Sequence, residues 1–300
     1  MRMKSASKLW HIITQTGLKP TPKTSVSEWA DEYRMLSKGI SAEPGRWKTS
    51  RAPYQKEMMD AFTQQGIHKV VVKSASQIGK SDIMNNVIGR YAHLDPSTIM
   101  MIQPTVDLAQ DYSKSRISPM ITDTPVLGKI FNSNSKDTST AKTRDGSNTI
   151  LSKLFPGGRL IMTGANSPAG LASRPIRVLL ADEVDRFPDS AGTEGDPVDL
   201  AAKRMTTFWN NVMGLFSTPT NEGSSRIDVE YIAGTQEEWQ HACPNCDEYH
   251  LLRHIDMICD YTEHKDAKGR KVVVVNDVKW RCPDCGMEFS EIAMRRSHHK

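Results

Sequence analysis

"KSASQIGKSD" (residues 73–82) directly follows the apolar run "KVVV" and contains a Gly-Lys-Ser tripeptide near its end. In a loop of the form GxxxxGK[ST], backbone N–H groups surround a phosphate, the lysine adds positive charge and the hydroxyl binds magnesium. Gly79, Lys80 and Ser81 fit this form, whereas Ser74 replaces its first glycine. That replacement is tolerable if position 74 does not need a positive φ. The tripeptide alone is a weak signal, so the flanking sequence has to decide.

The flanks favour a phosphate loop between a strand and a helix. A β-branched run enters the loop, and the apolar-periodic "DIMNNVIGRYAHL" (82–94) leaves it. The loop would then lie at a helix N-terminus, where backbone N–H groups and the helix dipole attract anions. Lys73 is a second candidate for a phosphate-binding charge, or else a surface lysine at a strand end. The loop residues predicted to bind the phosphates of ATP are Ser74, Ala75, Ser76, Gln77, Ile78, Gly79, Lys80 and Ser81.

A second acidic motif lies about a hundred residues further on. "IRVLLADEVDRF" (176–187) is an apolar strand pattern that ends in Asp182 and Glu183. Alone, such a pair is most often a solvated turn. Together with the phosphate loop it indicates a nucleotide site in which Asp182, with the Ser81 hydroxyl, holds Mg²⁺, and Glu183 orients and polarises the attacking water.

Two weaker features fit the same site. Tyr54 and Gln55 precede the first strand, where a phenol can stack on an adenine and an amide can pair with its edge; the plain alternative is a helix start. Ser217 and Thr218 end the strand "GLFSTPT", where hydroxyls can sense the γ-phosphate, or simply cap a turn.

The order of elements predicts an α/β fold with a parallel sheet covered by helices on both faces. Five apolar runs read as short buried strands, and helix-length segments such as residues 55–66 and 106–121 separate them. The five runs begin at residues 68, 97, 158, 176 and 211. The polar stretch 132–148 is too rich in Ser, Thr and Asn to pack, and we expect a surface loop or hairpin there.

Composition limits the class of protein. With 38% hydrophobic and 25% charged residues, a chain of 300 residues is an ordinary globular one. Its apolar runs are far shorter than the about 18 residues that cross a bilayer, so we expect a cytoplasmic protein with no membrane partner. The net charge of +4 is uneven: residues 1–60 hold 11 Lys/Arg against 6 Asp/Glu, and the remainder 28 against 29. This basic start indicates contact with nucleic acid or an acidic partner, or a solvated helical extension.

Four of the five cysteines form two CxxC pairs. Cys243 and Cys246 precede Cys282 and Cys285 by a stretch of 35 residues, longer than is usual, so an inserted hairpin is implied. In a reducing compartment two such turns favour four thiolates around structural Zn²⁺ over disulfides. The sequence predicts a small zinc-ribbon unit over residues 236–300, after a basic N-terminal extension (1–50) and a P-loop ATPase domain (51–235).

The quoted motifs resemble those of a known family. "APYQ", "KSASQIGKS", "TGANSPAGLASRPIRVLLADEVDRFP" and "FSTPT", in this order and followed by a CxxC pair, are similar to the ATPase half of the lambda-type large terminase subunit of tailed phages. The resemblance spans roughly residues 45–290, and the block from Thr163 to Pro188 is its most specific part.

The resemblance implies a RecA-like P-loop ATPase core that drives double-stranded DNA through a portal protein into a procapsid. It implies that Gln55 senses adenine, that Lys80 and Glu183 act in hydrolysis, and that Ser217 and Thr218 couple hydrolysis to movement. Partners implied are double-stranded DNA, the small terminase subunit, the portal and further copies of the chain; cofactors are ATP, Mg²⁺ and Zn²⁺. Four residues, Arg174, Arg177, Arg186 and Arg204, are available as a charge-stabilising arginine finger or, alternatively, for salt bridges or DNA contacts. Arg174, just ahead of the acidic motif, is preferred as the finger, because motors of this type often supply the charge from a neighbouring subunit. The family's nuclease domain is expected to be absent from this chain.

Two other functions share some of these features. A helicase-like translocase or remodeller would have the same nucleotide motifs, but it calls for a second RecA-like domain, for which the chain has no room. A zinc-ribbon DNA-binding adaptor with a degenerate nucleotide pocket would bind without turnover. An assay of ATP hydrolysis separates the adaptor from both motors.

Overall fold

The structure, a computed structural model, describes residues 23–39, 41–132, 149–221, 225–297 and 299. The polar loop expected at 132–148 lies, except for its first residue, outside these ranges, as do residues 1–22 of the expected basic extension. The chain forms two compact units, residues 1–234 and 235–300, and each is described by itself. Among the described helices, none is both long enough and apolar enough to span a bilayer.

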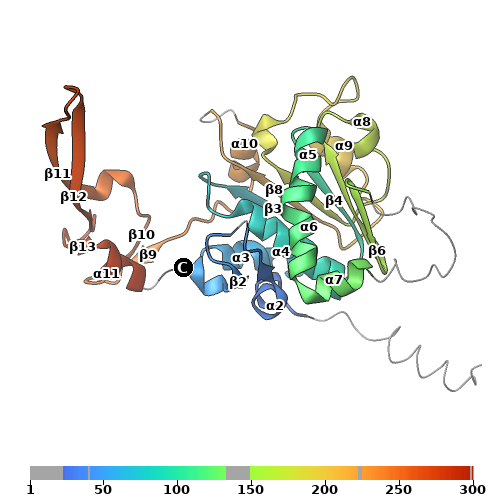
Figure 1. The fold of residues 1–300 in the computed structure, drawn as a ribbon, viewed down its shortest axis with the longest axis horizontal. Helices are drawn as coiled ribbons and strands as arrows, with labels where there is room; N and C mark the ends of the chain where they lie inside the picture. Colours follow the sequence, from blue (N-terminus) through green and yellow to red (C-terminus); the bar gives the residue numbers. More distant parts are fainter. Residues whose placement is uncertain (1–22, 40, 133–148, 222–224, 298, 300) are drawn as a thin grey trace, which may run out of the picture. The chain divides into compact units, whose positions relative to one another are not determined.

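A six-stranded sheet forms the centre of the larger unit (Figure 1). Its order is β3-β8-β7-β4-β6-β5, and the five strands that the sequence predicts are its five parallel members. These are β3 (Lys69–Lys73), β4 (Thr98–Gln103), β6 (Gly158–Gly164), β7 (Val178–Asp182) and β8 (Val212–Ser217). The sixth strand, β5 (Ser152–Phe155), pairs antiparallel with β6 at the edge. The sheet is therefore mostly, not wholly, parallel. The sequence did not predict β5, because four residues give too little periodicity.

Helices cover both faces of this sheet because each central strand is buried on both sides. Along β4, Ile99 and Met101 belong to one apolar core, whereas Met100 and Ile102 belong to the other. The first core lies against α2 (Val26–Tyr33), α3 (Gln55–Asp60), α4 (Lys80–Leu94), α5 (Val106–Tyr112), a π-helical turn (Ser113–Ile117), α6 (Ser118–Asp123) and α7 (Pro125–Asn132). The second lies against α8 (Pro168–Leu171), α9 (Pro197–Ala202) and α10 (Arg226–Ile232).

The segment before residue 51 packs into the first core where it is described. Ser25 and Glu28 form a capping box that starts α2, and this helix buries Trp29 completely against α4. A short antiparallel pair, β1 (Met35–Leu36) and β2 (Gly45–Arg46), follows. The described residues before residue 51 therefore belong to the larger unit. The boundary of a separate extension at residue 50 stays a prediction.

The smaller unit is built on two tight turns and a long hairpin. Its strands are β9 (His241–Ala242), β10 (Tyr249–His250), β11 (Met257–Lys265), β12 (Lys271–Arg281) and β13 (Glu288–Ser290), followed by α11 (Glu291–Arg296). β11 and β12 form the hairpin that the spacing of the cysteine pairs implied. Among the described residues, the buried apolar cluster of the unit has four members, Cys243, Trp280, Cys282 and Met294.

The close approach of α2 to α4 depends on Gly89. A Cβ atom there would lie 2.1 Å from Cη2 of Trp29, a side chain without exposed surface. We predict that Gly89→Ala lowers the free energy of unfolding by about 2 kcal/mol, because overpacking outweighs the higher helix propensity of alanine. Urea denaturation followed by circular dichroism measures this loss. Gly39→Ala is the control, since no atom lies within 4 Å of its added Cβ; equal midpoints for both variants would contradict the prediction.

Candidate active site

The loop between β3 and α4 has the backbone of a tight turn at its C-terminal end. Gly79 caps α4 with φ 89°, and a Cβ atom at this position would lie 2.3 Å from Nε2 of Gln55. Glycine is therefore needed here on two grounds. Gln77 also has a positive φ of 66°, whereas Ser74 is not among the residues with positive φ. The condition under which serine can replace the first glycine of the motif is met.

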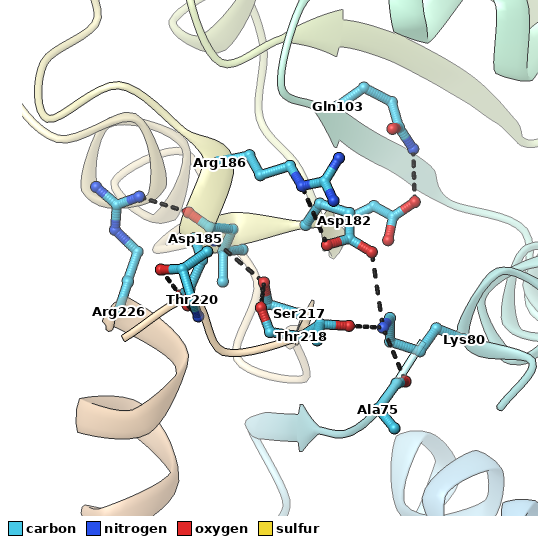
Figure 2. Close-up of polar contacts among 12 residues, drawn as sticks. Ala75, Lys80, Gln103, Asp182, Asp185, Arg186, Ser217, Thr218, Thr220 and Arg226 are labelled. Atoms are coloured by element: carbon cyan, nitrogen blue, oxygen red, sulfur yellow. Dashed lines mark hydrogen bonds and ion pairs between the residues drawn. The ribbon is translucent and has the colours of Figure 1, made fainter. Parts of the chain in front are cut away.

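Lys80 brings three segments of the chain to one point (Figure 2). Its Nζ lies 2.7 Å from Oγ1 of Thr218, which follows β8, and 3.3 Å from the carbonyl oxygen of Ala75. It also lies 3.6 Å from Oε1 of Glu183, which follows β7. The side chain is 7% exposed, so this ammonium group has exchanged most of its water for these oxygens.

Asp182 is a buried carboxylate beside this lysine. Its Oδ2 accepts a hydrogen bond from Nε2 of Gln103, which ends β4 (Figure 2). Burial raises the pKa of Asp182 to about 6; the hydrogen bond from Gln103 and the charge of Lys80 lower it, and the charge of Glu183 adds to the rise. An acid in this state favours a nearby cation, because a bound cation offsets the cost of burying its charge.

Glu183 stands in a left-handed backbone conformation, with φ 55°. For a residue other than glycine this costs of order 1–2 kcal/mol and persists only where neighbouring contacts hold it. Oε1 faces Lys80, and Oε2 lies 3.8 Å from Nε of the exposed Arg186. The strained turn carries the side chain of Glu183 from the strand end toward the loop.

Gln55 and Tyr54 contact the backbone of the loop. Nε2 of Gln55 and the hydroxyl of Tyr54 both donate to the carbonyl oxygen of Ile78, at 2.6 Å and 3.2 Å. On the other flank, the hydroxyl of Tyr112 lies 3.1 Å from the carbonyl oxygen of Ser81. These three side chains support the backbone of the loop from two sides. The adenine contacts of Tyr54 and Gln55 stay a prediction.

Lys73 and Arg174, both predicted for this site, have contacts or a cavity elsewhere. Nζ of Lys73 lies 2.6 Å from Oδ1 of Asp228 and 5.2 Å from the ring centre of Tyr231, so α10 engages it. Arg174 lines a cavity of about 440 Å³ together with Arg159 and Thr163, and no loop residue lines that cavity. The phosphate contact of Lys73 and the arginine-finger role of Arg174 stay predictions.

Ser217 is fully buried, and it has partners both in the turn after Glu183 and at the start of the loop. Its Oγ accepts a hydrogen bond from the N–H of Asp185, and its carbonyl oxygen accepts one from the N–H of Ser74. The residue thus joins the acidic turn to the start of the loop. Sequence reasoning missed Asp185, Gln103 and Tyr112; the signal for Gln103 was a polar residue ending an apolar strand, whereas the other two show no pattern along the sequence.

The four paired cysteines of the smaller unit come together at one point. Their sulfurs all lie within 4.8 Å of one another, with 3.7 Å between Cys243 and Cys285 and 3.8 Å between Cys246 and Cys282. A hydrogen bond with the backbone of Met287 lowers the pKa of Cys285 to about 7. Although a hydrogen bond with the Glu248 backbone lowers the pKa of Cys246, burial and the neighbouring thiols raise it to about 12. Four thiolates can coexist here only around a cation.

A mostly parallel α/β sheet with a glycine-capped loop, a buried lysine and an acidic strand end at one point is the arrangement of P-loop ATPases. Residues 41–298 match the family described as phage terminase large subunit gpA, ATPase domain, and the chain belongs to this family. This match confirms the resemblance read from the motifs.

Two curated relatives are terminase large subunits. The chain is 29% identical over 239 residues to the terminase large subunit of Escherichia phage lambda, covering 78% of this chain and 35% of that protein. It is 28% identical over 243 residues to that of Enterobacteria phage P21, with the same coverage of each chain. The chain thus spans about a third of the length of these relatives.

Solved structures give a weaker likeness. The large terminase ATPase domain of Thermus phage P74-26 is 14% identical with a TM-score of 0.35, covering 54% of this chain and 64% of that chain. The large terminase of another thermophilic bacteriophage is 16% identical with a TM-score of 0.38, covering 62% of this chain and 41% of that chain.

We predict that protons compete with a divalent cation at Asp182. Since burial raises its pKa to about 6, the carboxyl is mostly ionised at about pH 7 and mostly protonated at about pH 5. Affinity for Mn²⁺, used as a substitute for Mg²⁺, should fall about tenfold between these pH values. Electron paramagnetic resonance of free Mn²⁺ measures it. Asp182→Asn should bind Mn²⁺ weakly at both pH values. Equal Mn²⁺ affinity of the unaltered protein at the two pH values would contradict the prediction.

Proposed function

We propose that the chain is the ATPase motor of phage DNA packaging, which hydrolyses ATP to move double-stranded DNA into a procapsid. One observation carries the proposal: Nζ of Lys80 lies within 4 Å of oxygens from Glu183 and Thr218, which come from two other strands. The three motifs on which hydrolysis and coupling depend thus meet at one point. Family membership supports the same function.

In this proposal the loop from Ser74 to Ser81 binds the phosphates of ATP through its backbone N–H groups, and Lys80 neutralises their charge. Ser81 and Asp182 would hold Mg²⁺, which would supply charge stabilisation at the phosphates; the buried carboxyl of Asp182, with its raised pKa, fits this role. Glu183 orients and polarises the attacking water. The core is of the RecA-like kind.

Coupling and assembly are further parts of the proposal. Because Thr218 bonds to Lys80 and Ser217 bonds to the turn after Glu183, a change in charge at the phosphates would alter both contacts. Arg174 would serve a neighbouring copy of the chain, since motors of this type often supply such a charge from a neighbouring subunit. Proposed partners are double-stranded DNA, the small terminase subunit and the portal protein, and the proposed setting is the host cytoplasm.

The helicase-like translocase and the non-catalytic adaptor remain the alternatives. Displacement of one strand of a duplex during turnover would favour the first. Binding of ATP with no turnover, in the presence of double-stranded DNA, would favour the second.

We predict that Glu183→Gln, which keeps the shape of the side chain, lowers kcat for ATP hydrolysis at least about a hundredfold. Lys80→Ala should have an effect of similar size. Lys73→Ala is the matched lysine control and should lower kcat less than about tenfold, because Asp228 engages Lys73. Phosphate release with and without double-stranded DNA measures these rates. Equal rates for the unaltered protein and Glu183→Gln would exclude the mechanism.

We also propose that the smaller unit is a zinc ribbon. Four sulfurs at Zn–S distances of about 2.3 Å in a tetrahedron lie roughly 3.8 Å apart, which fits the two S–S distances of 3.7 Å and 3.8 Å. Four thiolates leave no open coordination position, so the role is structural. A core of four residues is small for independent stability, and a metal would supply what burial does not.

We predict that the purified protein carries about one equivalent of Zn²⁺, because four thiolates form one closed tetrahedral site. Cys282→Ser should remove most of it, and elemental analysis by mass spectrometry measures the loss. Cys259→Ser is the control, since Cys259 is exposed and belongs to no ligand group among the described residues. Full zinc content in Cys282→Ser would speak against the ribbon.

A further inference from the structure

Asp185 joins three separate segments of the larger unit. Figure 2 shows its contacts with Ser217 and Thr220. Its Oδ1 accepts a hydrogen bond from the N–H of Ile227, in the first turn of α10, at 2.8 Å. Its Oδ2 accepts one from the N–H of Thr220, in the turn after β8, at 3.0 Å. Its own N–H donates to Oγ of Ser217 at 3.2 Å. One carboxylate thus fixes the turn after Glu183 to both the coupling motif and a helix.

Arg226 connects α10 to the same turn, here with the side chain on the helix and the backbone acceptor in the turn. Its Nη1 donates to the carbonyl oxygen of Val184 at 2.6 Å, so the first residue of α10 grips the residue next to Glu183. Its Nη2 lies 2.7 Å from Oδ2 of Asp196, and the guanidinium lies over the ring of Phe187. The turn and the helix are therefore held together from both sides and should move together.

This arrangement explains what holds Glu183 in its strained backbone conformation. The φ of 55° needs neighbouring contacts to persist. The residues that follow, Val184 and Asp185, supply those contacts through Arg226, Ile227 and Thr220. Loss of any of them would let the turn relax and withdraw the carboxylate of Glu183 from Lys80.

α10 also contacts the strand that leads into the loop. Lys69 and Lys73, at the two ends of β3, lie 2.8 Å from Glu230 and 2.6 Å from Asp228. A displacement that starts at Glu183 can thus pass through Asp185 to α10 and from there to β3. These contacts connect the turn after Glu183 to the strand that precedes the phosphate loop.

We propose that Asp185 is a positioning residue that holds Glu183 in place for hydrolysis and passes the state of the nucleotide to α10. This inference rests on the proposed ATPase function, because it assigns a transmission path to the same site. The hydrogen bonds of Asp185 described above go to Ser217, Thr220 and Ile227 rather than to Lys80. Its effect is therefore indirect: the carboxylate acts through the backbone of the turn.

The test compares Asp185→Asn with Asp189→Asn, a matched control that loses the same charge on an exposed residue four positions away. An asparagine at position 185 turns a donor toward one of the two N–H groups and so breaks one bond. We expect kcat for ATP hydrolysis to fall about tenfold with KM for ATP unchanged, as for loss of one hydrogen bond to a charged group. Arg226→Gln should behave alike, and the control should match the unaltered protein.

A second measurement separates transmission from a plain structural role. Hydrogen exchange of backbone amides in α10 is followed in the full chain with Mg²⁺, with and without an imido-bridged ATP analogue that resists hydrolysis. We expect the analogue to change exchange in α10 of the unaltered protein and of Asp189→Asn. In Asp185→Asn the analogue should bind with the same Kd but leave the exchange of α10 unchanged.

The possible failures are distinct. If the unaltered protein binds the analogue and α10 does not respond, or if Asp185→Asn responds like the control, the inference is wrong while the proposed function stands. If the unaltered protein binds no analogue, the proposed function fails and this inference with it. A melting temperature of Asp185→Asn far below that of the control, with a response in α10 that persists, would reduce Asp185 to a structural residue.

Discussion

The larger unit depends on a buried ammonium group, that of Lys80. A charge with so little water around it is stable only if oxygens replace the lost solvent, and these oxygens come from the loop itself, from Glu183 and from Thr218. Each belongs to a different strand–turn connection, so the sheet must present the carboxyl ends of β3, β7 and β8 side by side. The sheet order, with β8 between β3 and β7, meets that demand.

Packing behind the loop serves the same end. α4 begins at Lys80 and is buried along most of its length, including polar residues such as Asn85 and Asn86. Trp29 packs on its back and Gln55 supports its cap, so two segments from before β3 fix the direction in which the helix leaves the loop. Packing thus fixes the position of Lys80, whereas its hydrogen bonds and ion pair balance its charge.

Much of this could be predicted from the sequence, for identifiable reasons. The five parallel strands have apolar side chains against both cores, so they appear as apolar runs, and Gly79 with Lys80 and Ser81 shows the loop directly. β5 was missed because a four-residue edge strand lacks a period. Asp185 and Gln103 were missed because their partners lie 42 and 79 residues away, and no local pattern reports such a pairing. The ion pair of Lys73 could not be predicted either, since its partner, Asp228, belongs to α10.

The two margins of the sheet bear on how copies of the chain can associate. β3 forms one margin and has a lysine at each end, both ion-paired to α10, while the other margin is the four-residue β5. Charged ends and a very short outer strand both discourage backbone pairing with a foreign strand. Extension of this six-stranded sheet by a strand from a second molecule is therefore disfavoured at both of its margins.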